Sequence, residues 1–131
     1  MYCLDSNIII SFFRGDTIIK NRLMNINNLE INTSITPIVL AELYKGAFIA
    51  ERSEEALSLI ESFLNGVTFI DFNKEACMIF GRVYKKLKKK GKLTEEEDLM
   101  IASIAIAHNQ ILVTRNIKHF KNIPDLKLEV W

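Results

Sequence analysis

The sequence has few of the residues that mark specialised protein classes. Its only two cysteines, Cys3 and Cys77, lie far apart and form no CxxC pair, so neither a disulfide framework nor a zinc ribbon is expected. We expect both thiols to be buried and reduced. No charged N-terminal segment leads into an apolar one, and no apolar run is long enough to cross a bilayer. These absences predict a soluble, cytoplasmic protein with no membrane association.

An excess of charge of one sign is also missing, since 17 Lys and Arg residues are offset by 16 Asp and Glu residues. The distribution of charge says more than the net charge of +1, because the basic run Arg82–Lys92 is followed directly by the acidic run Glu95–Asp98. Lys86, Lys89 and Lys90 are candidates for contacts with a phosphate backbone. The solvated end of a helix, where cations interact well with the helix dipole, explains the same run.

What the chain does contain is the composition of an ordered globular protein, with 49% hydrophobic and 25% charged residues. Its 131 residues fit one domain, residues 1–131. The expected strands are 1–4, 30–35, 67–70, 111–113 and 126–130, and the expected helices are 8–13, 17–27, 37–51, 53–64, 73–87, 94–107 and 116–120. Strands that alternate with helices predict a three-layer α/β/α domain with a mostly parallel central sheet.

Polar residues stand where several of these helices should begin. Asp5 precedes the first helix, and Thr36 precedes the third. Ser53 and Thr94 are expected to cap two later helices, with Glu97 completing a capping box for the second of them. Each of these side chains is expected to accept a hydrogen bond from the first turn of its helix.

Three carboxylates fall where a parallel sheet binds ligands, beyond the carboxyl ends of its strands. Asp5 follows the first strand, Glu42 lies within the apolar run 38–43, and Asp98 begins a helix with an uncharged body. Each has a plain structural explanation, as a helix cap, an exposed helix residue or an acid in a first turn. Together they would repel one another, and a hard divalent cation, Mg²⁺ or Mn²⁺, would remove that repulsion. Such a site can activate water and bind a phosphodiester for hydrolysis.

Four segments of the chain resemble the motifs of one family. The segments MYCLDSN, TSIT with AELYKG, DLMIA, and LVTRN with a downstream Phe are similar, in order and spacing, to those of PIN-domain VapC toxins. The resemblance covers essentially the whole chain. It implies a PIN fold, Mg²⁺- or Mn²⁺-dependent endoribonuclease activity, a homodimer, and inhibition by a small cognate VapB-like antitoxin. It also implies that promoter DNA is bound only through the complex with the antitoxin.

The same resemblance assigns roles to individual positions. The three carboxylates become the catalytic metal ligands, and Asn7 and Thr114 become polar supports that orient ligands or water. Many relatives carry a fourth acid in the last motif, where this chain has Asn116 and His119. That departure leaves open whether a second metal binds, and whether His119 joins the site or only caps a turn.

Three alternatives are compatible with parts of the pattern. A receiver domain would use Asp71 as its phosphoacceptor, but it has an acidic pair after strand one and a lysine after strand five. This chain has the single Asp5 after its first strand, and the turn at Thr114 offers Arg115. A PIN-fold binding or regulatory module with weakened catalysis would account for the neutral residues in the fourth motif. A nuclease acting on DNA is the third, since nothing in the sequence shows whether a 2′-hydroxyl is recognised.

Overall fold

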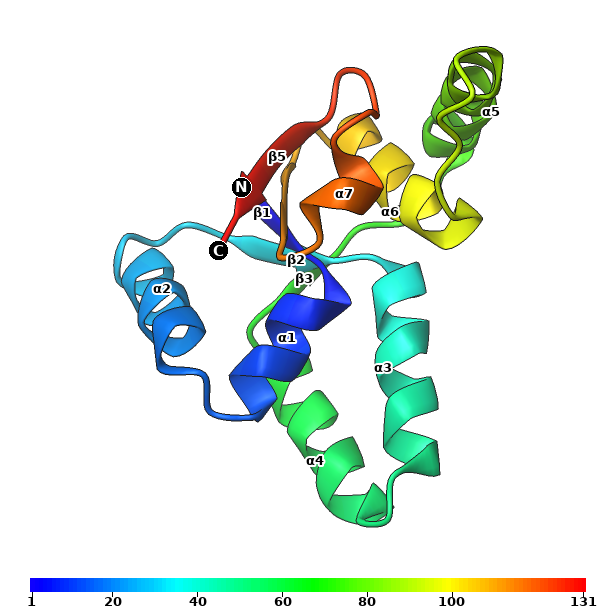
Figure 1. Ribbon diagram of the computed structural model, residues 1–131. Coiled ribbons are helices and arrows are strands. Elements are labelled where there is room, and N and C mark those ends of the chain that lie inside the picture. Colours follow the sequence, from blue (N-terminus) through cyan, green and yellow to red (C-terminus); the bar gives the residue numbers. More distant parts are fainter.

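The computed structural model describes residues 1–131 as a five-stranded sheet with seven helices around it (Figure 1). The strands are β1 (Tyr2–Leu4), β2 (Thr33–Ile35), β3 (Thr68–Phe69), β4 (Ile111–Thr114) and β5 (Lys127–Val130). The helices are α1 (Ser6–Phe13), α2 (Thr17–Asn28), α3 (Pro37–Ile49), α4 (Ser53–Leu64), α5 (Lys74–Lys89), α6 (Glu96–Ala107) and α7 (Ile117–Phe120). All pairings are parallel, in the order β3-β2-β1-β4-β5.

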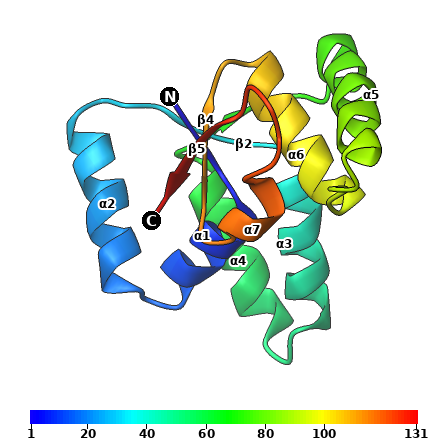
Figure 2. The same ribbon diagram turned by 45° about the horizontal axis from the view of Figure 1, so that its top comes forward.

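Helices lie on both sides of the sheet, as the alternation of elements predicts. In two views α2 lies to one side of the strands, and α5 and α6 lie to the other (Figures 1 and 2). The pair α3 and α4 packs as a hairpin that extends below the sheet in Figure 1. The predicted α/β fold with a central parallel sheet is therefore confirmed. None of the helices is both long and apolar enough to cross a membrane.

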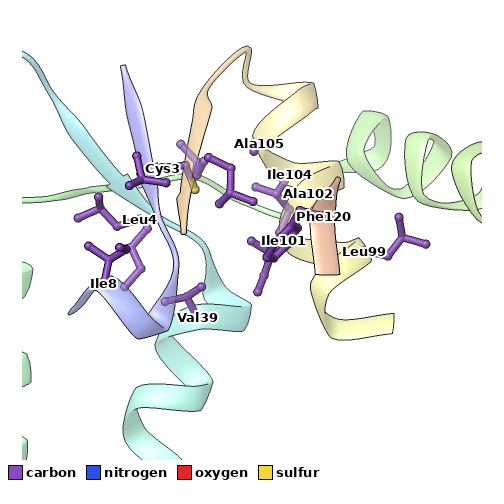
Figure 3. Close-up of a cluster of buried hydrophobic side chains, with 14 of the residues drawn as sticks. Cys3, Leu4, Ile8, Val39, Leu99, Ile101, Ala102, Ile104, Ala105 and Phe120 are labelled. Carbon is purple, nitrogen blue, oxygen red and sulfur yellow. The ribbon is translucent and has the colours of Figure 1, made fainter. Parts of the chain in front are cut away.

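The core explains why the body of α6 carries no charge. This helix packs against α5 and against β4, so residues on almost every side of it are buried. Ile101 and Ile104 are fully buried there, together with Phe120 of α7 (Figure 3). Burial of each such side chain contributes about 2 kcal/mol to the free energy of folding. Asp98, in the first turn of α6, is therefore attached to a rigid element.

Two predicted helix caps are wrong. Ser53 lies inside α4, whose cap residue is Arg52 and makes no side-chain cap bond. Thr94 does not cap α6 either, because its hydroxyl donates a hydrogen bond to the backbone carbonyl of His119 at 2.9 Å. The cap residue of α6 is Glu95, again without a side-chain bond. In the second case a tertiary contact has replaced the local bond that the sequence favours.

Two further expectations need correction. The strand expected over 30–35 begins only at Thr33, because Glu30 has a left-handed backbone (φ 56°) just after the end of α2. Cys77 is exposed on α5, whereas Cys3 is buried as expected. Both thiols are free, which agrees with the expectation that the fold uses no disulfide.

Candidate active site

The order of the strands reverses between β1 and β4. From β1 the chain continues to β2 on one side, and from β4 it continues to β5 on the other. The ends of the two strands are in register, with Leu4 beside Val113. Asp5 follows one strand end and Thr114 completes the other. Open α/β sheets bind ligands at such a reversal, outside the carboxyl ends of the strands.

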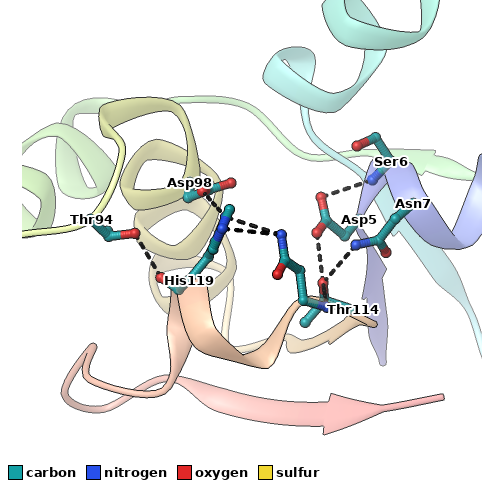
Figure 4. Close-up of polar contacts among 8 residues, drawn as sticks. Asp5, Ser6, Asn7, Thr94, Asp98, Thr114 and His119 are labelled. Carbon is teal, nitrogen blue, oxygen red and sulfur yellow. Dashed lines mark hydrogen bonds and ion pairs between the residues drawn. The ribbon is translucent and has the colours of Figure 1, made fainter.

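Asp5 is the most buried of the predicted metal ligands, with 5% of its surface exposed. Its Oδ1 accepts a hydrogen bond from the backbone N–H of Ser6 at 2.8 Å, which makes it the cap of α1 as expected. Its Oδ2 accepts a hydrogen bond from the hydroxyl of Thr114 at 2.7 Å (Figure 4). Burial raises the pKa of Asp5, and these two bonds oppose the rise. Two carboxylate oxygens offer about four acceptor positions, so capacity for a further ligand remains.

The hydroxyl of Thr114 is the centre of a polar network between the two strand ends. It accepts hydrogen bonds from Asn7 Nδ2 at 3.1 Å and from the backbone N–H of Asn116 at 3.0 Å. Since both acceptor positions of the hydroxyl are used, its proton is directed at Asp5. Asn7 also accepts a hydrogen bond from the backbone N–H of Arg115 at 3.2 Å. The residues predicted as polar supports thus lie together around the first carboxylate.

Asp98 contacts His119, the residue in the place of a fourth acid. The Nδ1 atom of His119 lies 2.7 Å from Asp98 Oδ2, and Asn116 Nδ2 lies 3.1 and 3.3 Å from Nδ1 and Nε2 of the ring. One proton arrangement satisfies both neighbours: Nδ1 donates to the carboxylate and Nε2 accepts from the amide. Burial raises the pKa of Asp98, and the contact with His119 opposes the rise. His119 therefore contacts one of the three predicted metal ligands directly.

Glu42 shares the electrostatic field of the other two acids. It is half-buried on α3, and its pKa is raised first by burial and then by repulsion from Asp5 and Asp98. The side chain of Ser6 opposes this rise. No lysine or arginine is among the groups that stabilise any of the three charges. The site therefore concentrates negative charge with only a histidine and neutral donors beside it.

This donor set fits a hard divalent cation in chemistry and in charge. Carboxylate oxygens are the ligands that Mg²⁺ and Mn²⁺ prefer. A cation would offset the burial that raises all three pKa values and the repulsion that adds to the rise for Glu42 and Asp98. In the side-chain conformations of the structure, no three His, Cys, Asp or Glu side chains converge closely enough to hold a metal ion. The structure thus brings the three carboxylates to one region without closing them on one point.

The predicted RNA-contacting lysines lie outside this cluster. Lys86 and Lys89 are exposed in the last turn of α5, and Lys90 follows at the cap position. None of the three forms an ion pair with the acids. Their place at a helix C-terminus agrees with the simpler explanation of a solvated, dipole-stabilising end. It also leaves their ammonium groups free for an external anion.

Three residues that hold the site were not identified from the sequence. Ser6 contributes its backbone N–H to Asp5, and its position directly after an Asp cap was the only signal for it. Thr94 fixes the backbone of His119, but its apparent role as a helix cap concealed this contact. Arg115 braces the loop between β4 and α7 through partners from three other segments, and no local pattern announces such a contact.

Comparison with known proteins agrees with this architecture. The sequence profile of the PIN domain family matches residues 2–126. The chain is 40% identical to ribonuclease VapC2 of Rickettsia felis, over 100% of this chain and 98% of that protein. It is 32% identical to the tRNA(fMet)-specific endonuclease VapC of Salmonella typhimurium, over 86% of this chain and 89% of that protein.

Comparison with solved structures also indicates similarity to VapC proteins. VapBC2 from Rickettsia felis, bound to a DNA fragment from its promoter, contains a chain that superposes with a TM-score of 0.92 at 37% identity. The superposition covers 99% of this chain and 98% of that one. Sequence and fold agree over the full length, and the motifs lie at the strand ends where the acids gather. The chain therefore belongs to the PIN domain family and, within it, to the VapC proteins.

Proposed function

We propose that this chain is a divalent-metal-dependent endoribonuclease and the toxin member of a toxin–antitoxin pair. The observation that carries the proposal is the group of three carboxylates at the sheet reversal, none of them neutralised by a lysine or arginine. Structural ion-pair networks need cations, and this cluster has none except the adjacent histidine. The names of two VapC relatives, a ribonuclease and a tRNA endonuclease, indicate RNA as the substrate class.

In this proposal Asp5, Glu42 and Asp98 hold Mg²⁺ or Mn²⁺. When bound, the metal supplies positive charge for the scissile phosphate and lowers the pKa of a water ligand. The protein's own contribution is orientation. Thr114 directs its proton to Asp5 Oδ2 and His119 bonds Asp98 Oδ2, so the two aspartate side chains are held in place and keep lone pairs for a metal.

The RNA backbone would approach along the turn between α5 and α6. A pocket of about 250 Å³ opens between this turn and α7, and Lys92, Lys118 and His119 are among the residues that line it. Because His119 also contacts Asp98, a phosphate in this pocket would lie next to the acidic cluster. The basic run Arg82–Lys92 leads toward the same turn, which supports the predicted role of its lysines in RNA binding.

An antitoxin would bind on the side of α1, α3 and α4. A groove of about 750 Å³ lies between α1, α2 and α4, and a second of about 390 Å³ lies between α1, α3 and α4. The grooves share Phe13 and Leu59, and the second is also lined by Glu42. Apolar residues make up half or more of each lining, as expected for a groove that receives an amphipathic segment. Residues of α2 line the first groove, and residues of α3 line the second.

The occupant we propose is the helical or extended segment of a small cognate antitoxin. The related structures from Rickettsia felis and Haemophilus influenzae are VapBC complexes, which supports such a partner. Not every apolar residue of α2 belongs to this surface, since Ile19 is fully buried in the core whereas Ile18 is 61% exposed. Promoter DNA would be bound by the complex and not by this chain alone. A homodimer is a further proposal that follows from the family.

The test is cleavage of RNA by the purified chain with and without Mn²⁺. We expect hydrolysis that requires the metal and that chelation abolishes. A matched single-stranded DNA tests the alternative nuclease, and calorimetric titration with Mn²⁺ tests the weakened binding module. Metal uptake without any cleavage would favour that module. Absence of specific metal uptake would overturn the assignment of the three carboxylates.

A further inference from the structure

Arg115 joins the loop after β4 to three segments that are distant in the sequence. Each guanidinium nitrogen donates to a different acceptor: Nη2 to Asp16 Oδ2 at 2.8 Å, Nη1 to Ser11 Oγ at 3.2 Å and Nε to the backbone carbonyl of Trp131 at 3.3 Å. The acceptors belong to the start of α2, the end of α1 and the segment after β5. A planar guanidinium can serve three directions at once, which the point charge of a lysine does not do.

The acceptors of this brace are themselves fixed. Asp16 caps α2 by accepting hydrogen bonds from the backbone N–H groups of Ile18 and Ile19 at 3.0 and 3.1 Å. Only 26% of its side chain and 36% of that of Arg115 are exposed. A partly shielded pair on rigid helix ends loses less side-chain entropy on forming than an open surface pair. The brace therefore links the loop to a fixed helix cap through a partly exposed ion pair.

The backbone of Arg115 lies inside the polar network of the site. Its own N–H donates to Asn7, whose amide donates to Thr114. The preceding residue, Thr114, bonds Asp5, and the following residue, Asn116, contacts His119. Both branches of the site, one ending at each aspartate, therefore depend on the position of this one loop.

We propose that Arg115 is a positioning residue that holds this loop against α1 and the start of α2, so that both aspartates keep the orientation needed to bind metal. The inference rests on the proposed function. In this proposal Arg115 itself contacts neither RNA nor metal. Its effect passes through Asn7, Thr114 and Asn116, and it is expected to change metal affinity and the rate of hydrolysis more than the affinity for RNA.

The experiment compares Arg115→Met with Arg22→Met. Arg22, on α2, is the matched control. It also contacts the C-terminal segment, through Glu129 at 3.7 Å and the ring of Trp131, whose centroid lies 5.7 Å away, but it forms no bond to the loop after β4. Loss of a residue that orients metal ligands typically lowers metal affinity or activity about 10- to 100-fold. We expect such a loss of Mn²⁺ affinity and kcat in Arg115→Met, with KM for RNA nearly unchanged, and no loss in Arg22→Met.

Two further variants separate positioning from general stability. Arg115→Lys keeps the charge, and we expect it to restore only part of the loss. Asp16→Asn keeps the cap of α2 but removes the ion pair, and we expect a smaller loss in the same direction even if Arg115→Met does not fold. If Arg115→Met and Asp16→Asn both fold and both keep the Mn²⁺ affinity and kcat of the wild type, the proposal is overturned.

A readout without metal keeps this inference independent of the proposed function. Hydrogen exchange of the Asn7 side-chain amide, followed by NMR in the metal-free chain, reports directly on its bond to Thr114. We expect faster exchange in Arg115→Met and in Asp16→Asn, and unchanged exchange in Arg22→Met. If the wild-type chain neither binds Mn²⁺ nor cleaves RNA, the proposed function fails. Unchanged exchange in both loop variants would instead refute the brace itself.

Discussion

Replacing Asp5 with Asn removes one negative charge from the acidic cluster with little change in shape. Asn caps helices about as well as Asp, so the bond from the N–H of Ser6 is retained. The bond from Thr114 is lost, because the hydroxyl already uses both acceptor positions and would meet an amide N–H₂ group. The variant therefore loses one hydrogen bond, but it no longer has the cost of a buried charge.

These two effects oppose each other in the metal-free protein. A hydrogen bond to a charged group contributes about 1.5–3 kcal/mol, which the variant loses. The raised pKa of Asp5 means that its ionised form is destabilised in the folded chain, and the variant is free of this penalty. We expect the free energies of unfolding of the two proteins to differ by less than about 1.5 kcal/mol at neutral pH, which is within the usual range for a single substitution.

The pH dependence has a definite sign. Because the pKa of Asp5 is higher in the folded than in the unfolded chain, its contribution favours folding below the unfolded value of about 3.9 and is lost as the pH rises through the folded value. The pKa values of Glu42 and Asp98 are raised as well, so metal-free stability should fall over the same range. The Asn variant should show a shallower fall.

Metal should stabilise the wild type but not the Asn variant. A ligand at 100 times its dissociation constant stabilises the folded state by about 2.7 kcal/mol, which corresponds to a rise in Tm of about 10 °C for a domain of this size. We expect this rise with Mn²⁺ in the wild type and its near absence in Asp5→Asn, together with loss of RNA cleavage. Glu42→Gln and Asp98→Asn should behave alike. A variant at position 5 that keeps both the metal-induced shift and cleavage would refute the proposed site.

Three further outcomes are expected. Changing His119 to Glu should raise Mn²⁺ affinity in calorimetry, because a carboxylate then replaces the imidazole ring beside Asp98, and an unchanged affinity would place residue 119 outside the metal's reach. Reversing the charges of Lys86, Lys89 and Lys90 together should weaken RNA binding and flatten its salt dependence without slowing hydrolysis at saturating RNA; an unaltered salt slope would return them to a plain helix end. Leu59 lines both apolar grooves, so Leu59→Glu should prevent a stable complex with the cognate antitoxin on co-expression, while RNA cleavage persists. An intact complex would show that the antitoxin binds another face.

The gathering of the acids could be predicted from the sequence because it depends on topology. Asp5 follows a strand directly, and parallel strands present their carboxyl ends at one edge. Asp98 begins a helix whose uncharged body indicates burial. The exposure of Cys77 was also predictable, since the buried positions Ala76, Ile79, Val83 and Leu87 follow helical spacing and position 77 lies off that stripe.

The contacts between elements could not be predicted in the same way. Thr94 has two possible acceptors, the first turn of its own helix and the carbonyl of His119, and only the approach of α7 decides between them. The three acceptors of the Arg115 guanidinium come from segments that no periodicity links to it. Local propensity fixes which groups need partners, whereas the packing of helices decides which partner each group finds.

Asp5 shows why a structural explanation does not exclude a functional one. The residue caps α1, and this role alone would account for an Asp between a strand and a helix. Capping does not explain the choice of Asp over Asn, however, since the two serve equally well. Next to Glu42 and Asp98, the carboxylate is buried and burial raises its pKa, so its ionised form has a cost in the metal-free fold that Asn would not have. A bound cation would remove that disadvantage. The comparison of Asp5→Asn with and without Mn²⁺ therefore separates the role of Asp5 in capping α1 from its role in binding metal.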